Sequence, residues 1–375
     1  MLLGGTITVS YAQNNLNVVT TAVPFLRISP DARSGGMGDV GIATSPDANS
    51  GFYNVAKTPW NTSKAGIGMN YSPWLRDLSV NDVFIASLAG YYKLDEDQAI
   101  SGSVRYFKLG TVQFTDQNGN DLQQYNPREM AIDLGYSRKL SNKFGLGIAV
   151  RYINSNLATG TFAGVGNVKA GNSVAGDLHL YYHGVNESGQ GLNWGLALSN
   201  LGSKISYVSD ASQKDYIPAN IGFGVAYTKV FDEANKITFA VDLNKLLVPT
   251  PPTLSGGTDP SGDSAKLKEY RDRSVASSWV RSFGDGYGVN NEIQEVNISA
   301  GAEYWYNDQF GFRAGYFYEN ANKGNRKYFT AGAAIKYNVA TLNFSYVFPT
   351  GSGISRNPLS NTYRFGLVFD LMNEK

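Results

Sequence analysis

Large apolar side chains alternate with small or polar ones along most of the chain after residue 63. In Met130–Ser137 the even positions hold Met, Ile, Leu and Tyr, whereas the odd positions hold Ala, Asp, Gly and Ser. The same period of two recurs in Phe144–Tyr152, Ile237–Leu243 and Phe310–Tyr318. Because successive side chains of a strand point to opposite faces, this period predicts strands with one apolar face and one polar face.

The composition indicates that the apolar face meets lipid rather than a soluble core. Gly (42), Tyr (24) and Phe (19) are abundant, and only 17% of residues are charged, against the usual roughly 25%. Aromatic residues lie near the ends of the apolar faces, as in the girdles of membrane barrels. No run approaches the roughly 18 apolar residues that a spanning helix needs. We therefore predict an all-β, transmembrane antiparallel β-barrel.

The spacing of the alternating segments predicts about 14 strands, an even number as in bacterial outer-membrane barrels. We place them at residues 63–72, 80–93, 98–109, 128–139, 143–154, 174–183, 191–201, 216–230, 236–245, 292–306, 309–319, 327–337, 339–348 and 361–371. Their connections alternate between tight turns and longer loops. This alternation predicts periplasmic turns at one end and extracellular loops at the other, with the barrel localised in the outer membrane.

The chain divides into three parts. Residues 1–12 are apolar and end in a small-x-small pattern, which predicts a signal peptide. We expect this signal peptide to be incomplete, because the positively charged n-region is missing. Residues 13–62 contain four prolines and a glycine cluster and do not alternate, so we expect a plug segment inside a wide barrel. Residues 63–375 form the barrel, with residues 246–291 as its longest extracellular loop.

Several classes of function are disfavoured by the composition. The formal net charge is +1, without the basic excess of a nucleic-acid binder, and the absence of Cys excludes thiolate chemistry. His179 and His183 face the lumen with Asp177 but lie roughly 13 Å apart along a strand, so we interpret them as polar lining rather than metal ligands. We expect no enzyme activity, no metal and no cofactor.

Ten charged residues lie on the small, lumen-facing side of the predicted strands. Buried charges need partners, so we expect these residues to pair with one another and with the plug. The ten are Arg105, Asp133, Arg151, Asp177, Asp242, Glu303, Arg313, Lys336, Arg364 and Asp370.

Two loops carry aromatic residues that could contact a partner. In loop 246–291 a charged stretch precedes an apolar one, residues 275–283, which we expect to form a short helix. Trp279 and Phe283 are candidate partner or cargo contacts, because aromatic anchors concentrate at interfaces; Trp279 could equally pack inside the loop. Trp74 and Leu75 in the first outer loop are further candidates, with anchoring at the membrane interface as the alternative.

Two sequence blocks near the N-terminus carry a resemblance to known barrels. Residues 32–43 (ARSGGMGDVGIA) and 47–54 (DANSGFYN) resemble the plug segment of the fatty-acid-transporter barrel superfamily. The resemblance assigns the plug motif to Arg33, Gly35, Gly36, Gly38 and Asn54. Those proteins continue with Asn-Pro-Ala, and this chain departs from them with Val55 in place of the proline.

Over nearly its whole length the chain is similar to the PorV family of the Bacteroidetes type IX secretion system. This resemblance rests on residues 23–33 (VPFLRISPDAR), 246–252 (LLVPTPP) and 301–306 (GAEYWY). It implies a non-catalytic outer-membrane protein beside the translocon barrel. Such a protein binds the C-terminal domains of secreted cargo and delivers them to the surface sortase and attachment complex, where lipopolysaccharide is attached. A transporter for hydrophobic small molecules is the alternative that the residues leave open.

Overall fold

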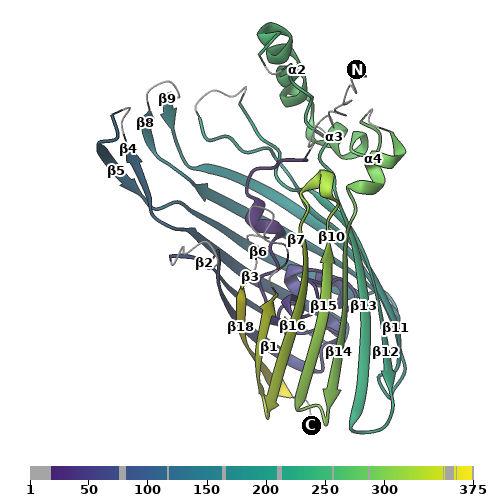
Figure 1. Cartoon of the computed structure of the whole chain (residues 1–375). Helices are drawn as coiled ribbons and strands as arrows, with labels where there is room; N and C mark the ends of the chain where they lie inside the picture. Colours follow the sequence, from purple (N-terminus) through teal and green to yellow (C-terminus); the bar gives the residue numbers. More distant parts are fainter. Residues whose placement is uncertain are drawn as a thin grey trace, which may run out of the picture.

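The computed structural model describes residues 18–75, 82–115, 118–162, 166–208, 213–255, 257–285, 288–348, 350, 359 and 361–373. Fourteen antiparallel strands form a closed barrel, in which β1 pairs with both β2 and β18 (Figure 1). The strands are β1 (Ser63–Pro73), β2 (Val83–Lys93), β3 (Gln98–Leu109), β6 (Arg128–Lys139), β7 (Phe144–Asn156), β10 (Gly171–Val185), β11 (Gly191–Gly202), β12 (Asn220–Val230), β13 (Asn235–Leu246), β14 (Asn297–Tyr306), β15 (Phe310–Tyr318), β16 (Lys327–Tyr337), β17 (Ala340–Val347) and β18 (Tyr363–Asn373).

The predicted barrel and its fourteen strands are confirmed. The expected start of the tenth strand at residue 292 is wrong, because residues 292–294 are helical and β14 begins at Asn297. Alternation places the large apolar side chains outside: in β6 and β7, Leu134 is 65% exposed and Val150 is 60% exposed, whereas Asp133 and Arg151 between them are buried. The outer face is therefore the lipid-facing face, and the buried polar face surrounds the lumen. The protein is therefore a multi-pass membrane barrel.

The two ends of the barrel differ in their connections. At one end, here the turn end, tight turns join the strands; Asn307, Asp308 and Asn338 adopt positive φ there, which short polar side chains tolerate. At the other end, here the loop end, the connections are long. They include the hairpins β4 (Val112–Thr115)–β5 (Asp121–Tyr125) and β8 (Gly160–Phe162)–β9 (Gly166–Val168).

The connection between β13 and β14 is helical. Asp259 caps α2 (Pro260–Asp272) by accepting a hydrogen bond from Gly262 N, and Ser274 caps α3 (Val275–Arg281) in the same way through Ser277 N. The expected short helix within residues 275–283 is thus α3, and α4 (Val289–Gln294) follows it. All three helices stand beyond the barrel rim (Figure 1). In the described part of the chain, no helix is long and apolar enough to cross a membrane.

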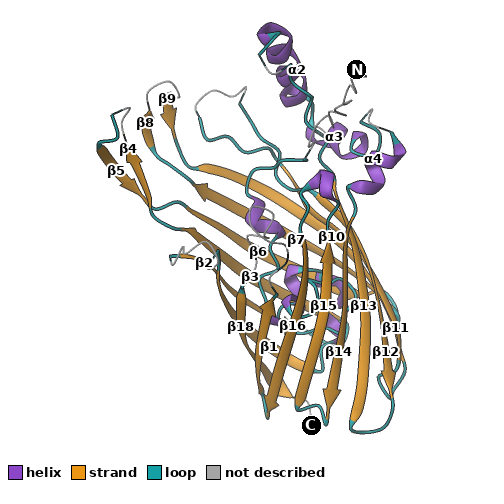
Figure 2. Cartoon of the chain, in the orientation of Figure 1, coloured by secondary structure: helices purple, strands orange, loops and turns teal. Residues whose placement is uncertain are grey.

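Residues 18–62 run from the loop end into the lumen and form the plug (Figure 2). Their short helices are η1 (Pro24–Arg27), α1 (Ala32–Gly35), η2 (Ser50–Phe52) and η3 (Val55–Trp60). Helix α1 packs against β16, β17 and β18, whereas η3 packs against β6, β7 and β10. The plug therefore spans the lumen from one side of the wall to the other.

The outward side chains near the middle of the strands provide a test of the lipid-facing surface. We expect Leu134→Arg to destabilise the barrel by roughly 2–4 kcal/mol, because a charge near the bilayer midplane loses its hydration. Urea titration of the protein refolded in lipid vesicles measures this cost. Leu134→Phe, which keeps the position apolar, is the control; an Arg variant as stable as the Phe variant would contradict the assignment of this face.

Candidate functional site

A buried carboxylate on the wall holds the plug through two guanidinium groups. Glu303 on β14 accepts bonds from Arg33 of the plug at both oxygens, Nε to Oε2 at 3.0 Å and Nη2 to Oε1 at 2.7 Å. Arg313 on β15 donates to the same carboxylate, Nε to Oε2 at 2.6 Å. Arg33 also bonds Asp47 through Nη1 at 3.0 Å. Burial lowers the pKa of Arg33, but Glu303 and Asp47 outweigh burial and raise it above its ordinary value.

Two further wall residues bind the plug near Gly41. Asp242 on β13 accepts bonds from the backbone N–H groups of Gly41 at 2.7 Å and Ile42 at 3.0 Å. Arg364 on β18 lies 3.2 Å from the carboxylate of Asp39. The plug is therefore held by charged groups from β13, β14 and β18, and each of these groups is nearly inaccessible to solvent.

The remaining lumen charges pair along the wall, as predicted. Arg151 lies between Asp133 and Asp177, with Nη2 donating to Asp177 Oδ2 at 2.9 Å. Arg105 lies 3.8 Å from Asp133 and also reaches the plug, where Nη1 donates to the Leu26 carbonyl at 3.1 Å. Lys336 and Asp370 form a more exposed pair toward the turn end.

The glycine motif permits the plug backbone to touch the wall. Gly38 has φ 68°, and a Cβ there would lie 2.6 Å from the Tyr316 backbone, too close for any side chain. A Cβ on Gly36 would meet the Gly332 backbone at 3.1 Å, and Gly35 packs beneath the Arg364 side chain. The motif thus acts as a contact surface, which brings Arg33 within reach of Glu303.

Asn54 and Val55 fix the second half of the plug. Asn54 is fully buried and its Nδ2 donates to the carbonyls of Ile42 at 3.2 Å and Leu180 at 3.1 Å, while its Oδ1 accepts from Ala56 N. The Val55 N–H donates to Nδ1 of His179 at 3.2 Å. A proline at position 55 has no N–H and could not make this bond, so the departure from the superfamily motif creates a contact between plug and wall.

Exposed apolar side chains occur on α3, on α4 and in the turn that follows α3. We name this set the loop patch: Val280 (75% exposed), Phe283 (54%), Val289 (75%) and Ile293 (66%). The Phe283 ring also lies 5.5 Å from Lys245 Nζ. Trp279 is only half-buried on α3 and adjoins the patch in sequence. Large apolar side chains that stand in water beyond a membrane rim are typical of interaction sites.

Buried ion pairs anchor the loop patch to the barrel rim. Glu295, directly after α4, binds Lys245 of β13 at 2.5 Å and Lys323 of η5 (Ala321–Lys323) at 2.9 Å. Lys245 also pairs with Glu292 at 2.8 Å. From the neighbouring loop, Lys204 donates to the carbonyls at the C-terminus of α2, and burial lowers its pKa. The helices are therefore held in place on the rim.

Trp74 and Leu75 lie elsewhere than the sequence led us to expect. Trp74 is buried and packs edge-on against Phe107 in an apolar cluster with Phe25 of the plug; Leu75 is half-buried against the same cluster. The reason is that the β1–β2 ladder continues past Pro73, with Trp74 N bonding Val83 O at 2.9 Å. Trp74 therefore turns inward with the strand alternation and is not presented to a partner in this structure.

The sequence interpretation missed two members of the loop patch, Val289 and Ile293. Their spacing of four residues is the signal that places both on one face of a helix. His179 and His183 point into the lumen with Asp177, as expected. In the described part of the chain no three His, Asp or Glu residues are grouped closely enough to hold a metal ion.

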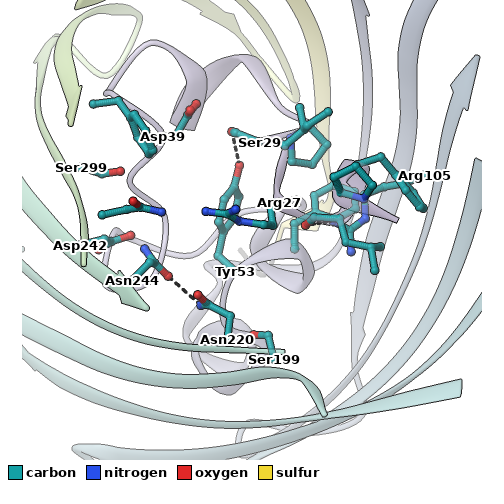
Figure 3. A pocket seen from close by; sticks show the side chains of 18 of the residues that line it. Arg27, Ser29, Asp39, Tyr53, Arg105, Ser199, Asn220, Asp242, Asn244 and Ser299 are labelled. Carbon is teal, nitrogen blue, oxygen red and sulfur yellow. Dashed lines mark hydrogen bonds between the residues drawn. The ribbon is translucent and has the colours of Figure 1, made fainter. Parts of the chain in front are cut away.

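A cavity of about 380 Å³ lies between the plug and the wall (Figure 3). On one side it is bounded by Asn, Ser and Asp side chains of β11–β14, and on the other by Arg105 and the apolar cluster around Phe107. Arg27 and Tyr53 of the plug lie between these two sides (Figure 3). We name it the lumen cavity.

The bidentate pair between plug and wall can be tested by mutation. We expect Glu303→Gln to destabilise the protein by about 3–5 kcal/mol, because it leaves the buried guanidinium group of Arg313 without its counter-charge and leaves Arg33 with Asp47 alone. Lys336→Gln is the control, since its partly exposed pair with Asp370 contributes only about 0–1 kcal/mol. Chemical denaturation in detergent measures both; equal effects would contradict the role of Glu303.

Comparison with solved structures shows that the fold is similar to that of solved transporter and channel proteins. The Ralstonia pickettii toluene transporter TbuX matches with a TM-score of 0.52 and 13% identity, over 94% of this chain and 97% of that one. The monoaromatic hydrocarbon channel CymD matches with a TM-score of 0.51 and 12% identity, over 91% and 97%. The Pseudomonas putida toluene transporter TodX matches with a TM-score of 0.50 and 11% identity, over 92% and 99%. At such low identity these similarities show the fold alone.

The sequence comparisons show the family. No curated protein matched the chain. Residues 10–253, more than half of the chain, match the family described as "Type IX secretion system protein PorV". That segment includes the whole plug motif and the wall strands that carry Asp133, Arg151 and Asp242. The chain therefore belongs to the PorV family of type IX secretion system proteins, and is an outer-membrane component of that system.

Proposed function

We propose that this barrel is a non-catalytic carrier in type IX secretion. It binds the C-terminal domains of cargo as they leave the translocon barrel, and it delivers them to the sortase and attachment complex at the cell surface. In this proposal the loop end faces the cell exterior and the turn end faces the periplasm. The loop patch is the contact surface, and its exposed apolar side chains are the observation that carries the proposal.

The composition and support of the loop patch suit a protein partner. Its four side chains offer apolar area that a partner would remove from water, and Trp279 beside them can join the contact. Because Glu295 and its two lysine partners hold the end of α4 on the rim, less conformational entropy is lost when a partner binds.

The plug supports a binding role over conduction. It is held to the wall at Glu303, Asp242, Arg364 and His179. A passage for hydrophobic molecules along the lumen would have to break several of these buried contacts, each of which leaves a polar group without a partner. We therefore place the interaction with cargo on the loop end, outside the lumen.

Excision of the helical loop tests the proposal at the level of the segment. We expect replacement of residues 254–288 by a short Gly/Ser turn to leave the barrel intact, because the β13–β14 ladder and the Lys245–Glu295 pair lie outside the excised segment. Cargo with the type IX C-terminal domain should then fail to reach the surface, or reach it unattached. Surface labelling of cargo and heat-modifiable migration of the barrel are the measurements.

A finer variant tests the patch itself. We expect the combined change Val280→Ser, Phe283→Ser, Val289→Ser and Ile293→Ser to lower surface-attached cargo several-fold at unchanged barrel abundance. The control changes two equally exposed apolar residues at the turn end, Leu140→Ser and Phe231→Ser. Cell fractionation with immunoblotting of one cargo protein measures both variants.

Three results would decide against this proposal. Normal cargo secretion and attachment in a strain that lacks the whole gene would defeat the carrier role. Normal secretion with altered uptake of a hydrophobic compound would favour the transporter alternative. Normal secretion in the patch variant would show that the contact with cargo does not lie on α3 and α4.

A further inference from the structure

Arg27 places a guanidinium group in the lumen cavity with little to neutralise it. The described residues offer it one ion pair, a 3.6 Å contact from Nη2 to Glu319 Oε1. Glu319 is already held by Arg326 through two bonds of 2.8 Å, from Nε to Oε2 and from Nη2 to Oε1. Two guanidinium groups therefore share one carboxylate. Burial, and then the repulsion from Arg326, lower the pKa of Arg27 to about 10.

The facing side of the lumen cavity offers hydrogen-bonding groups: amides, hydroxyls and the carboxyl group of Asp242. Cross-strand pairing places Asp242 beside Ser299, and Asn244 beside Asn297, so their side chains form one continuous surface. Oδ1 of Asp242 is buried and has no hydrogen-bond partner among the described residues. Buried acceptors of this kind are normally satisfied, so this oxygen points to a donor supplied from within the cavity.

These two features define the chemistry of an occupant. The planar guanidinium group of Arg27 matches the oxygens of a phosphate or carboxylate group. The amides and hydroxyls opposite match the hydroxyl groups of a polar ligand. A hydrocarbon in the same place would leave Oδ1 of Asp242 without a donor and Arg27 with only the Glu319 carboxylate that it shares with Arg326, at a cost in free energy.

We propose that the lumen cavity binds a small hydrophilic anion of the phosphate or carboxylate class that also bears hydroxyl groups. Its charged group lies on Arg27, and its hydroxyls lie on the side formed by Asp242 and Asn244. A volume of about 380 Å³ is at the small end of ligand pockets, which suits a ligand of about one sugar ring. This site is separate from the loop patch, so it does not depend on the carrier role.

Calorimetric titration of the full chain in detergent tests the proposal, with glucose 1-phosphate as the probe. We expect Arg27→Gln to weaken its binding by at least about tenfold, because a hydrogen bond to a charged group is lost. Arg281→Gln is the matched control, since Arg281 lies exposed on α3 outside the cavity. Glucose, which lacks the charge, should bind at least about tenfold more weakly than glucose 1-phosphate.

A second variant covers the case in which Arg27→Gln does not fold. Asn244→Leu removes hydrogen-bonding groups from the opposite side, and it should weaken glucose 1-phosphate more than inorganic phosphate. Heat-modifiable migration reports whether each variant is folded. No binding of glucose 1-phosphate, or equal binding by the folded Arg27→Gln variant, would overturn the proposal. Binding of palmitate in place of glucose 1-phosphate would overturn it in favour of a hydrophobic anion.

Discussion

A barrel of fourteen strands encloses more space than the side chains of its own wall fill, so a plug is needed, and charges inside must find partners. Eight strands already enclose a filled interior, whereas sixteen or more leave an aqueous channel. Here the plug fills the space that the wall side chains leave open, and Glu303 joins Arg33 of the plug to Arg313 of the wall. Removing one group from this arrangement would leave a buried charge, which costs more than the pair itself stabilises. The position of the plug, and with it the shape of the lumen cavity, depends on this interaction.

Much of the barrel could be predicted from the sequence, because strands and tight turns are determined by residues that are neighbours along the chain. The period of two separates lipid-facing from lumen-facing residues, and tight turns mark the strand ends. The sequence pattern also predicted that the lumen charges pair. The pattern could not predict which charges pair, because the pairing depends on the stagger of the strands and the path of the plug. Arg33 and Glu303 are 270 residues apart in the sequence, and only the closed barrel brings them together.

The functional surfaces were harder to predict, and for different reasons. Trp74 seemed to lie in a loop because the apolar pattern ends near it, yet one further ladder hydrogen bond turns it toward Phe107. The α3 helix was expected, because the apolar stretch at residues 275–283 is long enough to be recognised in the sequence. The α4 helix was missed because it is only six residues long and its last three residues, 292–294, were assigned to the strand that follows. Arg27 gave no signal at all, since its exposure to the lumen cavity follows from the path of the plug.

Toluene transporters have a similar fold, and a fold alone does not determine function. The function of this chain therefore has to be inferred from its side chains. Val55 donates a backbone hydrogen bond to His179 that a proline at this position could not make, and so adds a contact between plug and wall. The lumen cavity places Arg27 opposite Asp242 and Asn244, which is poor chemistry for a hydrocarbon. Exposed apolar side chains stand on α3 and α4, outside the barrel and anchored by Glu295. In the described part of the chain the unpartnered Oδ1 of Asp242 therefore faces the lumen, whereas the exposed apolar side chains of α3 and α4 lie at the rim, on the surface that a folded protein can reach.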